Sequence, residues 1–259
     1  MDQSIDHFHE HGWMRVESAL PAASAAAMRD AVWAALASVG IHRDRPSTWT
    51  VERPSHLQAL KNHAAFRWHA DDSLQQAIKA ILGPSCHPPD HWGAVFIAFP
   101  SSEPWGVPTR GWHIDANYRS QLNPSRGVKT LALFGEVEPR GGGTQVVAGS
   151  HRLVANWFAT NPPPADARSA ALRRLLLSQP YIGDLHRAGD PAERIARFIG
   201  RAEDAEGIRL QVVELAGAAG DVFLMHPLLM HAAAPNNSGR PRFMLSGGVT
   251  TDMWGWASG

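Results

Sequence analysis

The sequence predicts a mainly β protein, an antiparallel sandwich or barrel with helices before it and one helical insertion. Helical periodicity is confined to residues 1–90 and 151–210, whereas short apolar or alternating segments fill residues 91–150 and 211–259. Gly- and Pro-rich turns separate these segments without intervening helices, which favours antiparallel pairing. Since neither a repeat nor a linker interrupts the chain, we expect a single domain over residues 1–259.

The first 90 residues form a mostly helical support. Apolar side chains recur at helical spacing over residues 22–39 and 72–82, and Pro21 stands where a first-turn proline is tolerated. A short strand is expected at residues 13–16. Both helices are expected to pack on a sheet through their apolar faces.

The predicted strands are short runs bounded by turn residues. They are WGAVFIAF (92–99), GWHIDANY (111–118), TLALFGEV (130–137), TQVVAGS (144–150), IRLQVVEL (208–215), GDVFLMHPLLMHAAA (220–234) and RFMLSGGVT (242–250). Residues 151–210 instead contain two amphipathic helical patterns, the second capped by Asp190 and Pro191. An insertion of this length between strands is expected to act as a lid or binding segment.

Composition excludes several classes of function. The 24 Lys and Arg residues balance the 24 Asp and Glu residues and form no basic block, so a nucleic-acid partner is not expected. The single cysteine, Cys86, excludes an intramolecular disulfide and fits a reducing, cytoplasmic location. Neither a signal-peptide pattern nor a run of ~18 apolar residues is present, so we expect no membrane span.

The segment GWHIDANY carries the first candidate site residues. Side chains at i and i+2 of a strand share a face, so His113 and Asp115 project together while Trp112 and Ile114 project oppositely. A buried charge requires a partner. The two residues are therefore a structural pair, a proton-transfer pair or two ligands of one metal ion.

Residues 226–243 supply the missing element of a metal site. They contain His226, His231, Arg240 and Arg242. Two histidines and one carboxylate occupy one face of an octahedral ion and leave three positions open, as in non-haem Fe(II) oxygenases. A nearby arginine suits the far carboxylate of a bound 2-oxo acid.

Four segments in order carry a family resemblance: FHEHGWMRVESAL, HID, GGGTQVVAGSHR and GDVFLMHPLLMHAAAPNNSGRPR. Together they span nearly the whole chain. The sequence resembles the phytanoyl-CoA dioxygenase (PhyH-like) family of Fe(II)/2-oxoglutarate-dependent oxygenases. The resemblance implies a double-stranded β-helix, a jelly-roll or cupin-like barrel flanked by N-terminal helices, with the metal inside its mouth.

The resemblance also implies which residues form the site. His113, Asp115 and His231 would be the metal ligands and the catalytic residues. In this family the distal histidine stands eleven positions before the arginine that binds the co-substrate, a spacing that fits His231 and Arg242. His226 would then belong to the approaching strand.

The sequence departs from the family at one position. Family members often carry Ser or Thr two residues after the distal histidine, where its hydroxyl assists the arginine, but this chain has Ala233. Thr144 is a candidate replacement in the co-substrate pocket. Trp105, Asn117 and Tyr118 flank the ligand segment and are expected to contact the substrate.

The expected function is hydroxylation of a C–H bond in a small metabolite, using Fe(II), 2-oxoglutarate and O2 and releasing succinate and CO2. Desaturation, epoxidation or cyclisation in secondary metabolism would use the same residues, whereas Asp115 disfavours halogenation, for which related enzymes have Gly or Ala at that position. Two other classes stay open: a cupin-like protein that binds a small ligand without redox chemistry, and a zinc hydrolase. For the hydrolase we find no general base at motif spacing. The oligomeric state is left open.

Overall fold

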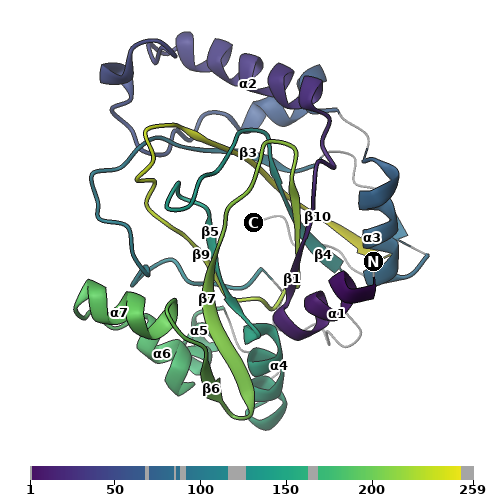
Figure 1. Ribbon diagram of the computed structural model, residues 1–259, viewed down its shortest axis with the longest axis vertical. Helices are drawn as coiled ribbons and strands as arrows, with labels where there is room; N and C mark the ends of the chain where they lie inside the picture. The colour runs from purple at the N-terminus through teal and green to yellow at the C-terminus, as the bar shows by residue number, and fades with distance from the viewer. Residues whose placement is uncertain are drawn as a thin grey trace.

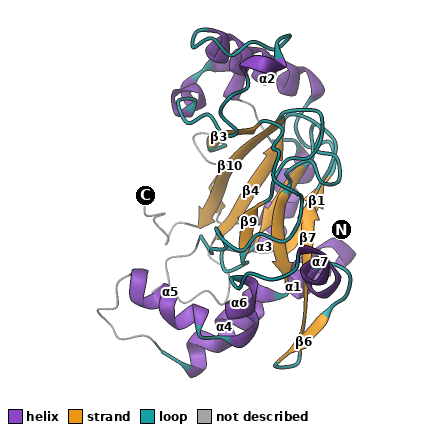
Figure 2. Cartoon of the chain, turned by 90° about the vertical axis from the view of Figure 1, so that its left-hand side faces the viewer, coloured by secondary structure: helices purple, strands orange, loops and turns teal. Residues whose placement is uncertain are grey.

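The computed structural model describes residues 2–67, 70–84, 86–87, 92–115, 127–162 and 169–251. Two β-sheets lie at its centre, with α2 at one end and α4–α7 at the other (Figure 1; Figure 2). The helices are α1 (Asp2–His11), α2 (Ala22–Ala37), α3 (Asp72–Leu82), α4 (Ser150–Thr160), α5 (Ser169–Leu177), α6 (Pro180–Leu185) and α7 (Pro191–Phe198), with short 3-10 helices η1 (Pro46–Thr48), η2 (Gln58–Asn62) and η3 (Ala64–Phe66). None of these helices is long and apolar enough to cross a membrane.

Most strands overlap the predicted runs. The strands are β1 (Trp13–Val16), β2 (Cys86–His87), β3 (Ala94–Ala98), β4 (Gly127–Leu133), β5 (Thr144–Ala148), β6 (Glu203–Ala205), β7 (Ile208–Leu215), β8 (Val222–Met225), β9 (His231–Ala233) and β10 (Arg242–Thr251). Strands β2 and β6 were not predicted, and the run at 220–234 forms two strands, β8 and β9. The larger sheet has the order β1-β8-β4-β10-β2, with β3 also paired to β10, and the smaller has the order β6-β7-β5-β9. Every ladder is antiparallel, as the absence of helices between most strands predicted.

Local capping explains where the predicted helices begin. The Asp71 carboxylate accepts a hydrogen bond of 2.9 Å from the backbone N–H of Leu74 at the start of α3. Asp190 does the same for Glu193 at the start of α7, where Pro191 occupies the first turn. The predicted Asp-Pro cap is therefore confirmed.

Three apolar clusters define the layers of the molecule. One lies between the outer face of the larger sheet and α1–α3, and includes Val128 and Ala132 of β4 and Phe134, the residue after it. Another lies between the outer face of the smaller sheet and α4–α7. The third fills the space between the sheets and contains Leu131 and Leu133. Alternate residues of β4 thus face the inter-sheet space.

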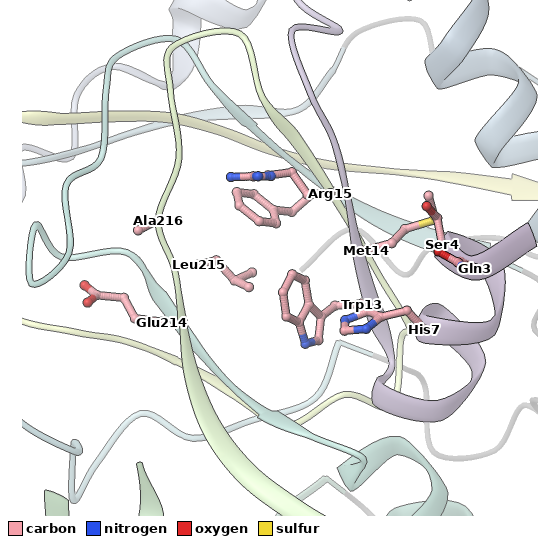
Figure 3. Close-up of a pocket in the computed structure, with 10 residues that line it drawn as sticks. Gln3, Ser4, His7, Trp13, Met14, Arg15, Glu214, Leu215 and Ala216 are labelled. Carbon is pink, nitrogen blue, oxygen red and sulfur yellow. The ribbon is translucent and has the colours of Figure 1, made fainter. Parts of the chain in front are cut away.

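The two sheets face each other without closing into a barrel. Strand β1 is paired to β8 and strand β7 to β5 and β6, and no ladder joins β1 to β7 in the described chain. A cavity of about 480 Å³ separates these edges, lined by residues 13–15 and 214–216 (Figure 3). The rings of Trp13 and Phe223, 6.1 Å apart, occupy part of this gap. The jelly-roll architecture is confirmed, as two facing sheets that no ladder of the described chain joins into a closed barrel.

The segment GWHID is not the strand that its alternation predicts. It joins the smaller sheet at one position, an isolated bridge between His113 and His231, and residues 116–118 lie outside the described residues. Gly111, with φ of 81°, turns the chain just before this bridge. The predicted alternation nevertheless holds, since Trp112 and Ile114 pack into the cluster under α4–α7.

One buried arginine ties the insertion to the segment that precedes His113. The guanidinium of Arg194 in α7 donates to the carbonyls of Arg187 at 2.6 Å and Leu185 at 2.9 Å, and also to those of Pro108 at 3.2 Å and Val107 at 3.4 Å. These bonds satisfy a charge that is otherwise costly to bury. They fix α6 and α7 against the residues that precede His113. A lid movement of the insertion stays a prediction.

A histidine pair, His151 buried and His226 half-buried, joins α1, α4 and the turn after β8. The rings of His151 and His226 lie 4.9 Å apart, and Nε2 of His151 is 3.1 Å from the carbonyl of His9. Burial lowers the pKa of His151 to about 4 and that of His226 to about 3. Both rings are therefore neutral at pH 7.

This pair predicts a loss of stability in mild acid. Below pH 6.5 the unfolded chain protonates both histidines while the folded protein does not, so the free energy of unfolding falls between pH 6.5 and 4, by up to ~1.4 kcal/mol per pH unit for each histidine. Urea unfolding at pH 7.5, 6 and 5 measures the loss. The variant His151→Asn should show a shallower pH dependence, and the exposed His56→Asn should match wild type. Equal slopes in all three proteins would contradict the assignment.

Candidate metal centre

Backbone pairing brings the predicted ligands together. The N–H of His113 donates to the carbonyl of His231 at 3.0 Å, and the N–H of His231 donates back to His113 at 2.9 Å. Two residues on, the N–H of Asp115 donates to the carbonyl of Pro227 at 3.2 Å. The segment that carries two candidate ligands is thereby fixed on the strand that carries the third.

The three side chains converge on one point. One ligand atom from each of His113, Asp115 and His231 lies within 4.8 Å of the other two. Nε2 of His231 is 3.4 Å from Oδ2 of Asp115, and Nε2 of His113 is 3.9 Å from Oδ1. Neighbouring ligand atoms around an ion with bonds of about 2.1 Å are roughly 3 Å apart at right angles. The residues therefore fit a divalent metal ion after small side-chain adjustments.

Each histidine is oriented by its second ring nitrogen. Nδ1 of His113 lies 2.7 Å from the carbonyl of Gly111, and Nδ1 of His231 lies 2.9 Å from the carbonyl of Leu229. A carbonyl only accepts hydrogen bonds, so each Nδ1 carries the proton and each Nε2 offers a lone pair. This is the tautomer that a metal ligand requires.

Burial and charge prepare the ligands to bind a cation. Burial lowers the pKa of His231 to about 4, so its imidazole is neutral at pH 7. Burial of Asp115 acts to raise the pKa of its carboxyl, but His231 and the Lys129 ammonium outweigh this effect and the pKa lies below its ordinary value. His113 leaves 55% of its side chain exposed, against 7% for His231. The centre is thus open on the His113 side.

Lys129 is a residue of this site that sequence reasoning missed. Its Nζ lies 2.6 Å from Oδ2 of Asp115, and only 15% of its side chain is exposed. The sequence did contain an indication of its position. Lys129 interrupts the apolar strand GVKTLAL and lies two and four residues before Leu131 and Leu133, which face the inter-sheet space.

Arg242 lies at the start of β10 with its guanidinium buried. Nη1 donates to the carbonyl of Gly142 at 2.5 Å, whereas Nε is buried without a hydrogen-bond partner. No carboxylate of the described chain lies within 4.0 Å of this guanidinium. Burial and the nearby Arg53 lower the pKa of Arg242 to about 10, although the Glu214 and Glu52 carboxylates partly oppose this shift, so the charge persists at pH 7. No feature of the sequence indicated that Arg53 would lie near Arg242.

Thr144 and Ala233 are direct partners across the ladder between β5 and β9. Partners in an antiparallel ladder point to the same face. Thr144 is buried, with Oγ1 3.8 Å from the sulfur of Met244, two residues beyond Arg242 on β10. Thr144 therefore stands on the same face as residue 233, one strand away.

Of the three residues expected to contact the substrate, the structure describes only Trp105. Trp105 lies against Arg140, whose guanidinium is 5.2 Å from the indole ring centre. The adjoining Gly106 accepts a bond of 3.0 Å from Gln145, which alternates with the inward-facing Thr144. No described contact joins Trp105 to the three ligands. Asn117 and Tyr118 lie outside the described residues.

The sequence matches the phytanoyl-CoA dioxygenase (PhyH) family over residues 8–244. The chain belongs to this family. Among curated proteins, none matches the sequence. As a PhyH-family protein it falls in the general class of Fe(II)/2-oxoglutarate-dependent oxygenases, and the His-Asp-His arrangement agrees with that class.

Solved structures with a similar fold span almost the whole chain. AviO1 from Streptomyces viridochromogenes Tue57 has a TM-score of 0.53 and 17% identity, covering 97% of this chain and 95% of its own. HygX from Streptomyces hygroscopicus, solved with nickel and 2-oxoglutarate bound, has a TM-score of 0.55 and 14% identity, covering 99% and 89%. SnoK, a non-haem α-ketoglutarate-dependent carbocyclase from nogalamycin biosynthesis, has a TM-score of 0.53 and 15% identity, covering 97% and 84%. At these identities the similarity establishes the fold.

The geometry predicts that each of the three ligands contributes to metal affinity. Replacing His231 by Ala should weaken Ni(II) binding by at least ~100-fold, because one of three ligands is lost. Isothermal titration calorimetry measures the dissociation constant. The matched control is His226→Ala, at a neighbouring half-buried histidine outside the triad, which should bind Ni(II) within a few-fold of wild type. Unchanged binding in His231→Ala would show that the ion binds elsewhere.

Proposed function

We propose that this PhyH-family protein is an Fe(II)- and 2-oxoglutarate-dependent oxygenase that hydroxylates a C–H bond of a small metabolite. The observation that carries the proposal is the convergence of His113, Asp115 and His231, together with the buried guanidinium of Arg242, which alternates on β10 with the inter-sheet residue Met244 and has a donor without a partner. A structural ion pair between His113 and Asp115 would require neither His231 nor Arg242.

Bound Fe(II) would supply the oxidation of substrate by O2, coupled to conversion of 2-oxoglutarate into succinate and CO2. The chain's own groups hold and orient the reactants. Two neutral imidazoles and one carboxylate bind one face of the ion and leave the other face for ligands. The open side at His113 gives a small molecule access, while His231 lies in the interior.

Arg242 binds the distal carboxylate of 2-oxoglutarate in this proposal. Its planar guanidinium can donate two parallel hydrogen bonds to a carboxylate. The Nε that has no partner is one available donor. Because the site is buried, water screens the attraction weakly and the charge pair is strong. A co-substrate anion also offsets the cost of burying Arg242.

Thr144 completes this anion site. It occupies the ladder position opposite Ala233, where the hydroxyl of other family members is missing. Its Oγ1 can donate one further hydrogen bond to the carboxylate.

The Asp115 carboxylate supports hydroxylation over halogenation, since it fills the position that a halide would need. Desaturation, epoxidation and cyclisation would use the same protein groups, and the position of the substrate decides among them. A cupin-like protein without redox chemistry would show no coupling of 2-oxoglutarate to a second compound. Screening metabolites for substrate-dependent succinate release therefore separates the two classes and identifies the substrate.

The role of Arg242 can be tested by the affinity for 2-oxoglutarate. Under anaerobic conditions, wild type with Fe(II) and 2-oxoglutarate should give a visible metal-to-ligand charge-transfer band. In Arg242→Met the 2-oxoglutarate concentration needed for half of this band should rise about 10- to 100-fold, because a charged hydrogen-bonded pair of about 1.5–3 kcal/mol is lost. Succinate release in the presence of substrate should fall in parallel.

The matched control is Arg240→Met, two residues away. Arg240 is exposed and pairs with Glu136 at 3.0 Å, so its loss should leave the titration unchanged. Equal behaviour of the two variants would refute the assignment of Arg242. Absence of the band in saturated wild type would count against the oxygenase proposal itself.

The hydroxyl of Thr144, opposite Ala233, can be tested in the same way. Thr144→Val should weaken 2-oxoglutarate binding about fivefold, the effect of one neutral hydrogen bond of ~1 kcal/mol. Adding Ala233→Ser in the same protein should restore much of the affinity, because residues 144 and 233 are ladder partners. The anaerobic titration measures both variants. A double variant as weak as Thr144→Val alone would mean that the two positions do not reach the same carboxylate.

A further inference from the structure

A lysine faces the inter-sheet space at the level of the metal centre. Lys129 on β4 alternates with Leu131 and Leu133, which belong to the cluster between the sheets. In the ladder it is opposite Met225 of β8, another member of that cluster. The side chain is only 15% exposed, so its charge requires a partner in the interior.

That partner is a single oxygen of the candidate ligand Asp115. Nζ of Lys129 is 2.6 Å from Oδ2, the oxygen that also lies 3.4 Å from Nε2 of His231, whereas Nε2 of His113 is 3.9 Å from Oδ1. The ammonium therefore contacts the carboxylate at the point where the three candidate ligands converge.

We propose that Lys129 is a positioning residue that holds the Asp115 carboxylate in the orientation from which it can bind a metal ion together with His113 and His231. The inference rests on the proposed metal centre. A ligand that is held in place before the ion binds loses less conformational freedom on binding, so the ion binds more tightly.

The described contacts favour orientation over occupation of the metal position. A side chain that took the place of the ion would contact the imidazole nitrogens as well as the carboxylate. Lys129 has a described ion pair with Asp115, and it reaches that residue from the larger sheet, whereas His231 belongs to the smaller one. Groups that hold a ligand in this way commonly change metal affinity 10- to 100-fold when removed.

Cobalt(II) binding without 2-oxoglutarate or turnover tests the proposal. Calorimetry gives the dissociation constant, and the intensity of the Co(II) visible bands reports the coordination number. Lys129→Met should raise the dissociation constant 10- to 100-fold and change the band intensity. Lys129→Arg and Lys129→Gln retain a donor and should stay within about tenfold of wild type, with the wild-type spectrum. The exposed Lys79→Met, in α3, is the matched control and should behave as wild type.

Two outcomes would overturn the inference. Lys129→Met with wild-type affinity and spectrum would mean that the ammonium does not position Asp115, and tighter binding would mean that it competes with the ion. Thermal unfolding of the metal-free protein shows whether Lys129→Met folds. If it does not fold, Lys129→Gln is the deciding variant, and a 100-fold loss of Co(II) affinity or an altered spectrum in it would refute orientation by a hydrogen bond. Failure of wild type to bind Co(II), or equal binding by His231→Ala, would instead refute the metal centre, so the two failures are distinguishable.

Discussion

The reciprocal pair of backbone hydrogen bonds between His113 and His231 is the interaction on which the candidate site depends. It is the point where the ligand segment joins the smaller sheet, and it sets the two imidazole rings 4.2 Å apart. Asp115 follows two residues later and returns to the same side of the chain. A single bridge suffices because Trp112 and Ile114 anchor the opposite side of the segment in an apolar cluster.

The second constraint is how the buried charges between the sheets are neutralised. Asp115 and Lys129 neutralise each other there, whereas the guanidinium of Arg242 is buried with one donor unused. Burial of an uncompensated cation is costly unless an anion joins it. Between the sheets, the described residues thus include an internal ion pair and a buried guanidinium with an unused donor, and we propose that the co-substrate anion binds there, beside β10.

The helical insertion contributes to the same arrangement from outside. Arg194 spans the gap between α7 and the carbonyls of Val107 and Pro108, a few residues before His113. Helices far along the chain thus support the approach to the ligand segment. In Figure 2, α5 and α6 lie at the same end of the sheets as α4, where their apolar faces cover the outer side of the smaller sheet.

The sequence by itself determined the helices and strands whose periodicity is long and regular, such as α3 over Asp72–Leu82 and β7 over Ile208–Leu215. It also determined the shared face of His113 and Asp115, because i and i+2 side chains point the same way in extended backbone. Family resemblance, rather than periodicity, selected His231 and Arg242. Only the tertiary structure decided that Lys129 meets Asp115, that Thr144 stands opposite Ala233, and that no ladder of the described residues joins β1 to β7. These facts depend on which strands become neighbours, and alternation within one strand carries no information about the strand across the sheet or the charge across the interior.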